Sequence, residues 1–74
     1  MIKFEIVEQI GVLAENSATG WKKELNRVSW NEGQPKYDIR DWSEDHCLMS
    51  RGVTLTDAEM QALMKAMLER KETK

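Results

Sequence analysis

The sequence of 74 residues contains a single cysteine, Cys47, so no disulfide bond can form within the chain. An unpaired cysteine is typical of proteins from a reducing compartment. No run approaches the ~18 consecutive apolar residues that a membrane-spanning helix needs. Charged residues interrupt the apolar start of the chain at Lys3, Glu5 and Glu8, which is not the pattern of a signal peptide. We therefore expect a soluble, cytoplasmic protein without a membrane partner, and association with the nucleoid stays open.

Histidine is equally scarce, because His46 is the only one and stands beside Cys47 in an acidic loop. A zinc site needs about four ligands and a nucleophilic dyad needs an oriented base, so this pair meets neither requirement. We expect both side chains to be exposed in the loop. Asp38, Arg40 and Trp42 are expected on one strand face, and an ion pair is the ordinary explanation for the first two. The sequence thus predicts no catalytic residue, no metal, no cofactor and no small-molecule substrate.

The chain is too short for more than one domain, so residues 1–74 are expected to fold as a single unit. A chain of this size buries only roughly 60% of the surface that its unfolded form exposes, which leaves a monomer marginally stable. Neither a disulfide nor a metal site is expected to stabilise it. Oligomerisation is the remaining common solution for small domains. We therefore expect a homodimer.

What the sequence does contain is a repeated alternation of apolar and polar residues, the pattern of β-strands with one buried face. Turn-forming residues at 16–20 and 31–35, and a polar loop at 43–50, separate these segments. Gly11 predicts a bulge or bend within the first of them. The even-numbered positions of that segment are expected to face a core: Ile2, Phe4, Ile6, Ile10 and Val12. The predicted strands cover residues 2–13, 21–30, 36–42 and 52–55.

A capping box over residues 56–59 marks the beginning of a helix, since the Thr56 hydroxyl and the Glu59 carboxylate each satisfy a free backbone amide. The prediction is an α+β fold, with a four-stranded antiparallel sheet over about residues 2–55 and one C-terminal amphipathic helix over about 57–71. One helix covers one face of a sheet, so we expect the other face to be wet or to bind a partner. The apolar stripe of the helix is expected to pack on the sheet and to join two chains. The residues predicted for this dimer interface are Met60, Leu63, Met64 and Met67.

Aromatic and cationic residues are concentrated in the middle of a chain whose formal net charge is -2. Residues 21–42 contain all three tryptophans, the only tyrosine, and five cations against four carboxylates. Aromatic faces that stack on bases, beside cations that track phosphates, bind single-stranded nucleic acid. The acidic total argues against indiscriminate binding of polyanions, and tryptophan and arginine also suit protein-protein hot spots. The residues alone leave open a nucleic-acid-binding protein, a protein-interaction module and tryptophans that serve only as core.

Two strand motifs resemble a known family. Residues 37–42 read Tyr-Asp-Ile-Arg-Asp-Trp, and residues 51–56 read Arg-Gly-Val-Thr-Leu-Thr before the acidic-capped helix. This combination resembles the positive cofactor four family of transcriptional coactivators, and residues 21–40 resemble its bacterial YdbC branch. The resemblance spans roughly residues 3–68. It implies a homodimer, formed largely through the helices, that binds single-stranded DNA with little sequence preference in transcription, replication or repair.

Carried over by position, the resemblance implies that Arg40 is the strand arginine that faces nucleic acid and that Trp30 lies where the family places a stacking aromatic. Arg51 occupies the basic position before the glycine of the last strand. The chain departs from the eukaryotic members at Ser43, where they have a second aromatic, and in an acidic loop at 43–50. Single-stranded DNA is the expected partner, with RNA as the alternative because stacking and phosphate contacts do not read the 2′-hydroxyl. We expect two tryptophans to stack and six cations to contact phosphates: Lys22, Lys23, Arg27, Trp30, Lys36, Arg40, Trp42 and Arg51.

Overall fold

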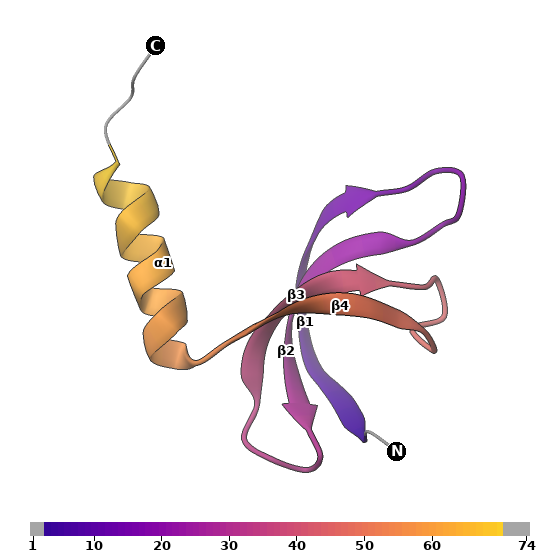
Figure 1. Cartoon of the computed structure of the whole chain (residues 1–74), viewed down its shortest axis with the longest axis horizontal. Coiled ribbons are helices and arrows are strands. Elements are labelled where there is room, and N and C mark those ends of the chain that lie inside the picture. Colours follow the sequence, from indigo (N-terminus) through magenta and orange to yellow (C-terminus); the bar gives the residue numbers. More distant parts are fainter. Residues whose placement is uncertain (1–2, 71–74) are drawn as a thin grey trace.

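The computed structural model describes residues 3–70. It contains four strands followed by one helix (Figure 1), and neighbouring strands are antiparallel in the order β1-β2-β3-β4. This architecture confirms the predicted fold, although the last strand begins inside the predicted 43–50 loop. The expected start of the sheet at Ile2 and the expected end of the helix at Lys71 lie outside the described residues. The elements are β1 (Phe4–Glu15), β2 (Lys22–Trp30), β3 (Lys36–Trp42), β4 (Met49–Leu55) and α1 (Asp57–Glu69).

The turn between β2 and β3 holds two residues in the left-handed region. Asn31 has φ 52° and Glu32 has φ 64°, and the Gly33 amide donates to the Trp30 carbonyl at 2.9 Å. Positive φ at both central residues is the geometry of a type I′ turn, which here lies inside a longer connection, because the last β2–β3 pair is Val28–Lys36. Asn is common in this conformation, whereas Glu is not. The turn therefore reverses the chain between β2 and β3 at some cost in backbone strain.

The strand register divides the side chains into two faces, because residues directly opposite each other point to the same side of a sheet. One face, which we call the core face, carries the β2–β3 pairs Glu24–Arg40, Asn26–Asp38 and Val28–Lys36. The other, which we call the helix face, carries the pairs Lys23–Asp41, Leu25–Ile39 and Arg27–Tyr37. Arg27 forms an ion pair with Asp57 of α1, which places the helix on the second side.

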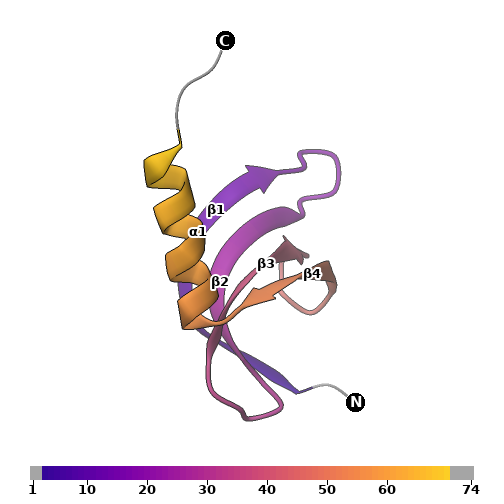
Figure 2. The ribbon, with the colours of Figure 1, turned by 60° about the vertical axis from the view of Figure 1, so that its left-hand side comes forward.

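The buried core lies on the face away from the helix, which corrects the expectation that this face is uncovered. The sheet is strongly curved (Figure 1 and Figure 2), and its core face closes around Val28 and Trp42, both 0% exposed. The ring of Phe4 lies 5.2 Å from that of Trp42. The polar residues Asn26 and Asp38 are buried on the same face. Alternation indicates which residues share a face, but it does not indicate which face the sheet curls around.

Strand β1 departs most from its predicted pattern. Its register with β2 slips at three places, and the extra residues are Val7, Ile10 and Leu13. One of these slips lies next to Gly11, as predicted, and bulges of this kind bend a strand and strengthen its twist. The expectation that Ile10 and Val12 are buried in the core is wrong, since they are 42% and 57% exposed, although Val12 lies opposite Glu24 of the core face. The repeated slips break the period of two, so even-numbered positions no longer share one face.

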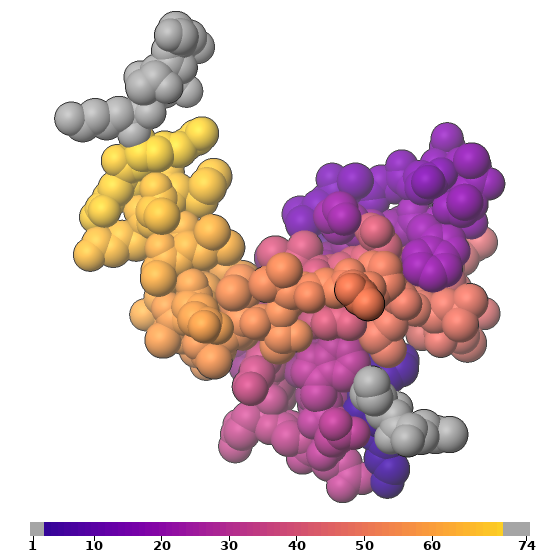
Figure 3. All heavy atoms as spheres, viewed as in Figure 1, coloured from indigo at the N-terminus to yellow at the C-terminus, as the bar shows by residue number. Residues whose placement is uncertain are grey.

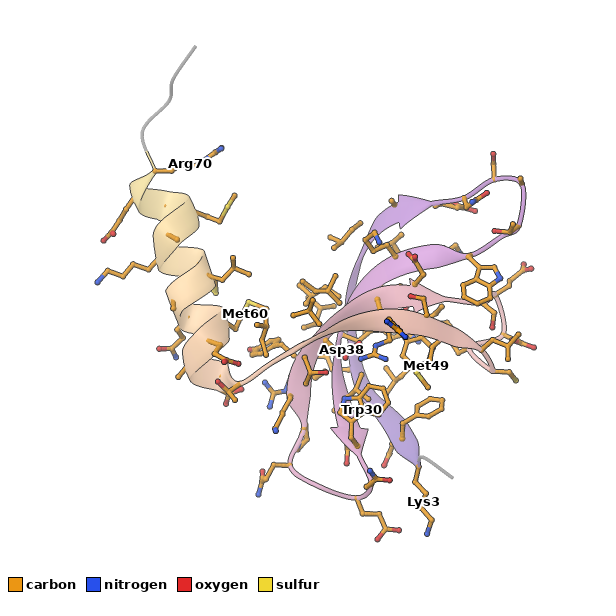
Figure 4. All side chains as sticks on the ribbon, viewed as in Figure 1. Lys3, Trp30, Asp38, Met49, Met60 and Arg70 are labelled. Carbon is orange, nitrogen blue, oxygen red and sulfur yellow. The ribbon has the colours of Figure 1, made fainter. Side chains whose placement is uncertain are left out.

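Helix α1 begins with the predicted capping box. The Thr56 hydroxyl accepts from the Glu59 amide at 3.1 Å, and the Glu59 carboxylate accepts from the Thr56 amide at 2.9 Å. Figure 3 shows that the helix then extends away from the sheet, so it covers little of the helix face. Met60, predicted for the dimer interface, instead points from the first part of α1 toward the sheet of its own chain and is 7% exposed (Figure 4). No helix within residues 3–70 is long and apolar enough to cross a membrane.

Candidate nucleic-acid interface

A buried ion pair lies at the centre of the core face. The Arg40 Nε donates to Asp38 Oδ1 at 2.6 Å and its Nη2 donates to Asp38 Oδ2 at 2.8 Å. The side chain of Asp38 is 0% exposed and that of Arg40 is 13% exposed. The Thr54 hydroxyl also donates to Asp38 Oδ2, at 3.0 Å. The ion pair expected from the sequence is thus present, and its bidentate geometry fixes the guanidinium in place.

Trp30 lies over this guanidinium. The Arg40 Cζ is 4.6 Å from the centroid of the Trp30 ring, which is the geometry of a cation–π contact. Phe4 packs beside the indole with its ring centroid 6.0 Å away. Figure 4 labels Trp30, Asp38 and Met49, and the Arg40 side chain contacts all three of these residues. Trp30 is half-buried, so an indole held from one side still presents part of its surface to solvent.

The close approach of Arg40 to β4 depends on Gly52. Gly52 lies opposite Arg40 in the β3–β4 register. A Cβ atom at this position would collide with the Arg40 side chain and with the Ile39 carbonyl oxygen, and would lie 2.9 Å from Arg40 Nε. The glycine before Val53, which the sequence motif contains, therefore has a steric role. It lets the Arg40 side chain, which contacts Trp30, approach β4 closely.

Trp42, predicted to stack on bases, is part of the core instead. It is 0% exposed and packs against Phe4 and against His46, whose ring centroid is 5.6 Å away. A ring with no accessible surface has no face to offer to a base, so we remove Trp42 from the candidate site. Its position on the same strand face as Arg40 was predicted correctly. The curvature that buries it was not visible in the sequence.

The predicted cations do not form one patch. On the core face Lys36 is exposed and Lys22 is half-buried. On the helix face Lys23 Nζ lies 3.3 Å from Asp41, and Arg27 Nη1 lies 3.1 Å from Asp57. We call Lys22, Trp30, Lys36 and Arg40 the Trp30 surface, since the register places all four on the core face.

Arg27 and Arg51 have different surroundings. The Arg27 guanidinium lies 4.6 Å from the Tyr37 ring centroid, and its hydrogen bond to Asp57 raises the pKa of the arginine above its ordinary value. This side chain therefore connects the sheet to α1. Arg51 is exposed on the edge strand β4, at the register shift opposite Asp41. Its position leaves it accessible to a ligand that crosses the edge of the sheet.

The β3–β4 loop contains a contact that sequence reasoning missed. His46 was expected to be exposed, but its Nε2 lies 3.0 Å from the Glu24 carboxylate, its side chain is 29% exposed, and it packs on Trp42. His46 adopts φ 61°, which turns the loop back onto the sheet. Cys47 is exposed, as predicted. No local signal indicates the contact, because Glu24 lies on β2 and meets the loop only after the sheet has curled.

The same loop is held by Asp45, whose carboxylate accepts from the Cys47 amide at 3.0 Å and from the Ser43 hydroxyl at 2.9 Å. These hydrogen bonds lower the pKa of Asp45 below its ordinary value. The nearby carboxylate in turn raises the pKa of the Cys47 thiol. Across residues 3–70 no group of three or more His, Cys, Asp or Glu side chains is arranged to hold a metal ion.

The chain is similar to a family model and to a bacterial protein. The family model described as Transcriptional Coactivator p15 (PC4) matches residues 17–66, which include β2, β3, β4 and most of α1. A protein of Treponema pallidum (strain Nichols), described as uncharacterized, is 48% identical over 60 residues. That match covers 81% of this chain and 69% of the Treponema protein.

Proposed function

The chain belongs to the Transcriptional Coactivator p15 (PC4) family, and from this premise we propose that it binds single-stranded DNA through the Trp30 surface as a homodimer. Membership in this family supports a DNA-binding, coactivator-like and non-enzymatic function. We further propose that the protein belongs to the bacterial YdbC branch, is cytoplasmic and acts in transcription, replication or repair. Binding is expected to depend little on base sequence, since stacking and phosphate contacts tolerate every base.

The observation that carries the proposal is the half-buried indole of Trp30, held over Arg40 at 4.6 Å. A base that stacks on an aromatic ring gains most when the ring is already in place, because less side-chain freedom is lost on binding. The bidentate contact to Asp38 fixes Arg40, and Arg40 in turn fixes the indole. We therefore assign Arg40 a positioning role beneath Trp30, in place of the direct phosphate contact that the resemblance implied.

The phosphate contacts are assigned to those predicted cations that form no ion pair with a carboxylate within residues 3–70. Lys36 and Arg51 are exposed, and Lys22 is half-buried on the core face. Lys23 and Arg27 are engaged by carboxylates on the helix face, so we do not include them in the binding surface. The three remaining cations are compatible with the formal net charge of -2, because each contacts a phosphate locally and no strongly positive field of the whole protein is needed.

The homodimer is supported by apolar surface that the described chain leaves exposed. On α1, Leu63 is 42% exposed and Met64 and Met67 are each 55% exposed. The hydrophobic residues buried within residues 3–70 are Val28, Trp42 and Met60, which is a small core for a chain of this length. A second copy is the occupant that we propose for this stripe. Methionine side chains adapt to irregular contacts and suit such an interface.

Titration of a labelled oligo-dT at several salt concentrations tests the DNA-binding proposal. Each phosphate contact on a single strand adds about 0.7 to the slope of log K against log salt. We expect Lys36→Ala to lower the slope, while Lys23→Ala, which removes a cation of the helix face, leaves it nearly unchanged. A duplex of equal length should bind more weakly, because paired bases do not offer their faces to Trp30. Absence of measurable binding at low salt would contradict the proposal, and stronger binding of oligo-rU would redirect it to RNA.

A further inference from the structure

Phe4 is an aromatic residue of the core face that lies beside the Trp30 surface. It is the first residue of β1 and lies directly opposite Trp30 in the β1–β2 register, so the two side chains point to the same side of the sheet. Their ring centroids are 6.0 Å apart, which is within the range of aromatic pairs. Two aromatic rings are therefore neighbours at this end of the core face.

The position of β1 in the sheet keeps part of the Phe4 side chain accessible. β1 is an edge strand, so within residues 3–70 no further strand of the sheet lies on its outer side. The Phe4 ring packs on Trp42, with 5.2 Å between the centroids, yet Trp42 is 0% exposed whereas Phe4 is half-buried. Trp42 belongs to β3, which has a neighbouring strand on both sides. Phe4 thus contributes to the core and still presents part of its surface to solvent.

The rings of Phe4 and Trp30 are tilted relative to each other. Their planes are inclined at 46°. A base is planar, so one base cannot lie flat on both rings at once. Proteins that bind single strands without sequence preference stack successive bases on successive aromatic side chains. The pair therefore has the geometry to receive two neighbouring bases, one on each ring.

We infer that Phe4 is a second stacking residue, so that the ligand unit of this surface is two consecutive nucleotides, with one base on Trp30 and the next on Phe4. This inference rests on the proposed function. Arg40 lies 4.6 Å from the Trp30 ring and Trp42 packs on the Phe4 ring, so both rings are held in place before a base arrives. If Phe4 serves the core alone, its aromatic face makes no difference to DNA binding.

Strands that carry few bases test the inference with the unmodified protein. They have equal length and are abasic throughout, except for one thymine or two adjacent thymines, and a fully abasic strand gives the baseline. We expect the second thymine to tighten binding at least about fivefold, the lower end of the range for one stacked base. This exceeds the statistical gain that one ring shows because either base can occupy it. Absence of the gain would overturn the inference and leave the proposed function intact. A first thymine that adds no affinity to the abasic strand would count against the proposed function itself.

Three variants assign the gain to the Phe4 ring. Phe4→Leu keeps an apolar side chain against Trp42 but removes the aromatic face, so the second thymine should add little while the first still binds through Trp30. Phe4→Tyr keeps the ring and should keep the gain. Ile6→Leu is the matched control, because Ile6 is half-buried on the same face of β1, opposite Val28, and its replacement changes core packing alone. A gain that survives in Phe4→Leu would overturn the assignment to Phe4, and so would an equal loss in Ile6→Leu.

Discussion

At the scale of residues, the position of the Trp30 indole depends on successive contacts that begin at the buried Asp38 carboxylate. Asp38 holds Arg40 through two hydrogen bonds of 2.6 and 2.8 Å, and Arg40 supports the indole. The sequence motif contains Asp38 and Arg40 two positions apart, so the ion pair could be predicted. The indole above it could not, because Trp30 reaches Arg40 only through the curvature of the sheet.

Gly52→Ala tests these contacts at the point where β4 comes closest to the Arg40 side chain. The added methyl group collides with Arg40 and with the Ile39 carbonyl, so we expect displacement of the guanidinium and weaker binding of oligo-dT. Loss of one stacked base corresponds to about 1–3 kcal/mol. Gly11→Ala is the control, since a Cβ there meets no atom within 4 Å. If the Gly52 variant folds and binds like the unmodified protein, Arg40 does not position Trp30.

The reactivity of Cys47 tests the geometry of the β3–β4 loop. The hydrogen bond and the charge of Asp45 raise the pKa of the Cys47 thiol, so less thiolate is present at mildly alkaline pH and alkylation is slow. Replacement Asp45→Asn removes the carboxylate charge, lowers the pKa of the thiol and should speed alkylation by iodoacetamide. The rate should rise with pH in both proteins, with the midpoint at lower pH in the variant. Identical pH profiles would contradict the loop geometry.

At the scale of elements, the alternation of residues predicted the strands well and their packing poorly. The β3 pattern placed Asp38, Arg40 and Trp42 on one side, and the register agrees. The capping box predicted the start of α1 for a local reason, since both of its hydrogen bonds lie within four residues. The slips in β1 depend on how that strand bends around β2, which is a property of the folded sheet. The sequence could therefore indicate the bulge near Gly11 but not its repetition.

The β2–β3 turn offers a test of an element whose backbone is strained. Glu32 has φ 64°, a region that costs an L-residue with a Cβ roughly 1–2 kcal/mol and costs glycine little. Glu32→Gly should raise the free energy of unfolding by about 0.5–1 kcal/mol, after allowance for the greater freedom of glycine in the unfolded chain. Loss of the exposed Lys3–Glu32 ion pair, at 3.4 Å, changes the free energy of unfolding little.

Urea denaturation of the Glu32→Gly variant measures this difference. Glu44→Gly is a suitable control, because Glu44 is also exposed in a loop but has no positive φ. The control should be neutral or slightly destabilising. A Glu32 variant that is less stable than the unmodified protein would show that the left-handed conformation is not the dominant cost in this turn.

At the scale of the whole molecule, the chain leaves an apolar helix largely unpacked, and the proposed dimer accounts for it. Met64→Glu combined with Met67→Glu should convert a dimer into a monomer, because two carboxylates per chain would be buried without partners. Gln61→Glu is the control on the same helix, since it adds charge at a polar, exposed position. Sedimentation equilibrium measures the mass of each protein. A monomer in the unmodified protein at high micromolar concentration would contradict the proposed dimer.

The central claim is that one tryptophan of the three provides the stacking surface for single-stranded DNA. Trp42 is 0% exposed, whereas Trp21, just before β2, and Trp30, at the end of β2, are both half-buried. Titration of oligo-dT with Trp30→Ala and Trp21→Ala therefore shows whether binding depends on the tryptophan at position 30 or falls with the loss of either tryptophan. The account predicts a loss of about 1–3 kcal/mol in binding free energy for Trp30→Ala and little change for Trp21→Ala. Equal losses in the two variants, or a loss confined to Trp21→Ala, would contradict it.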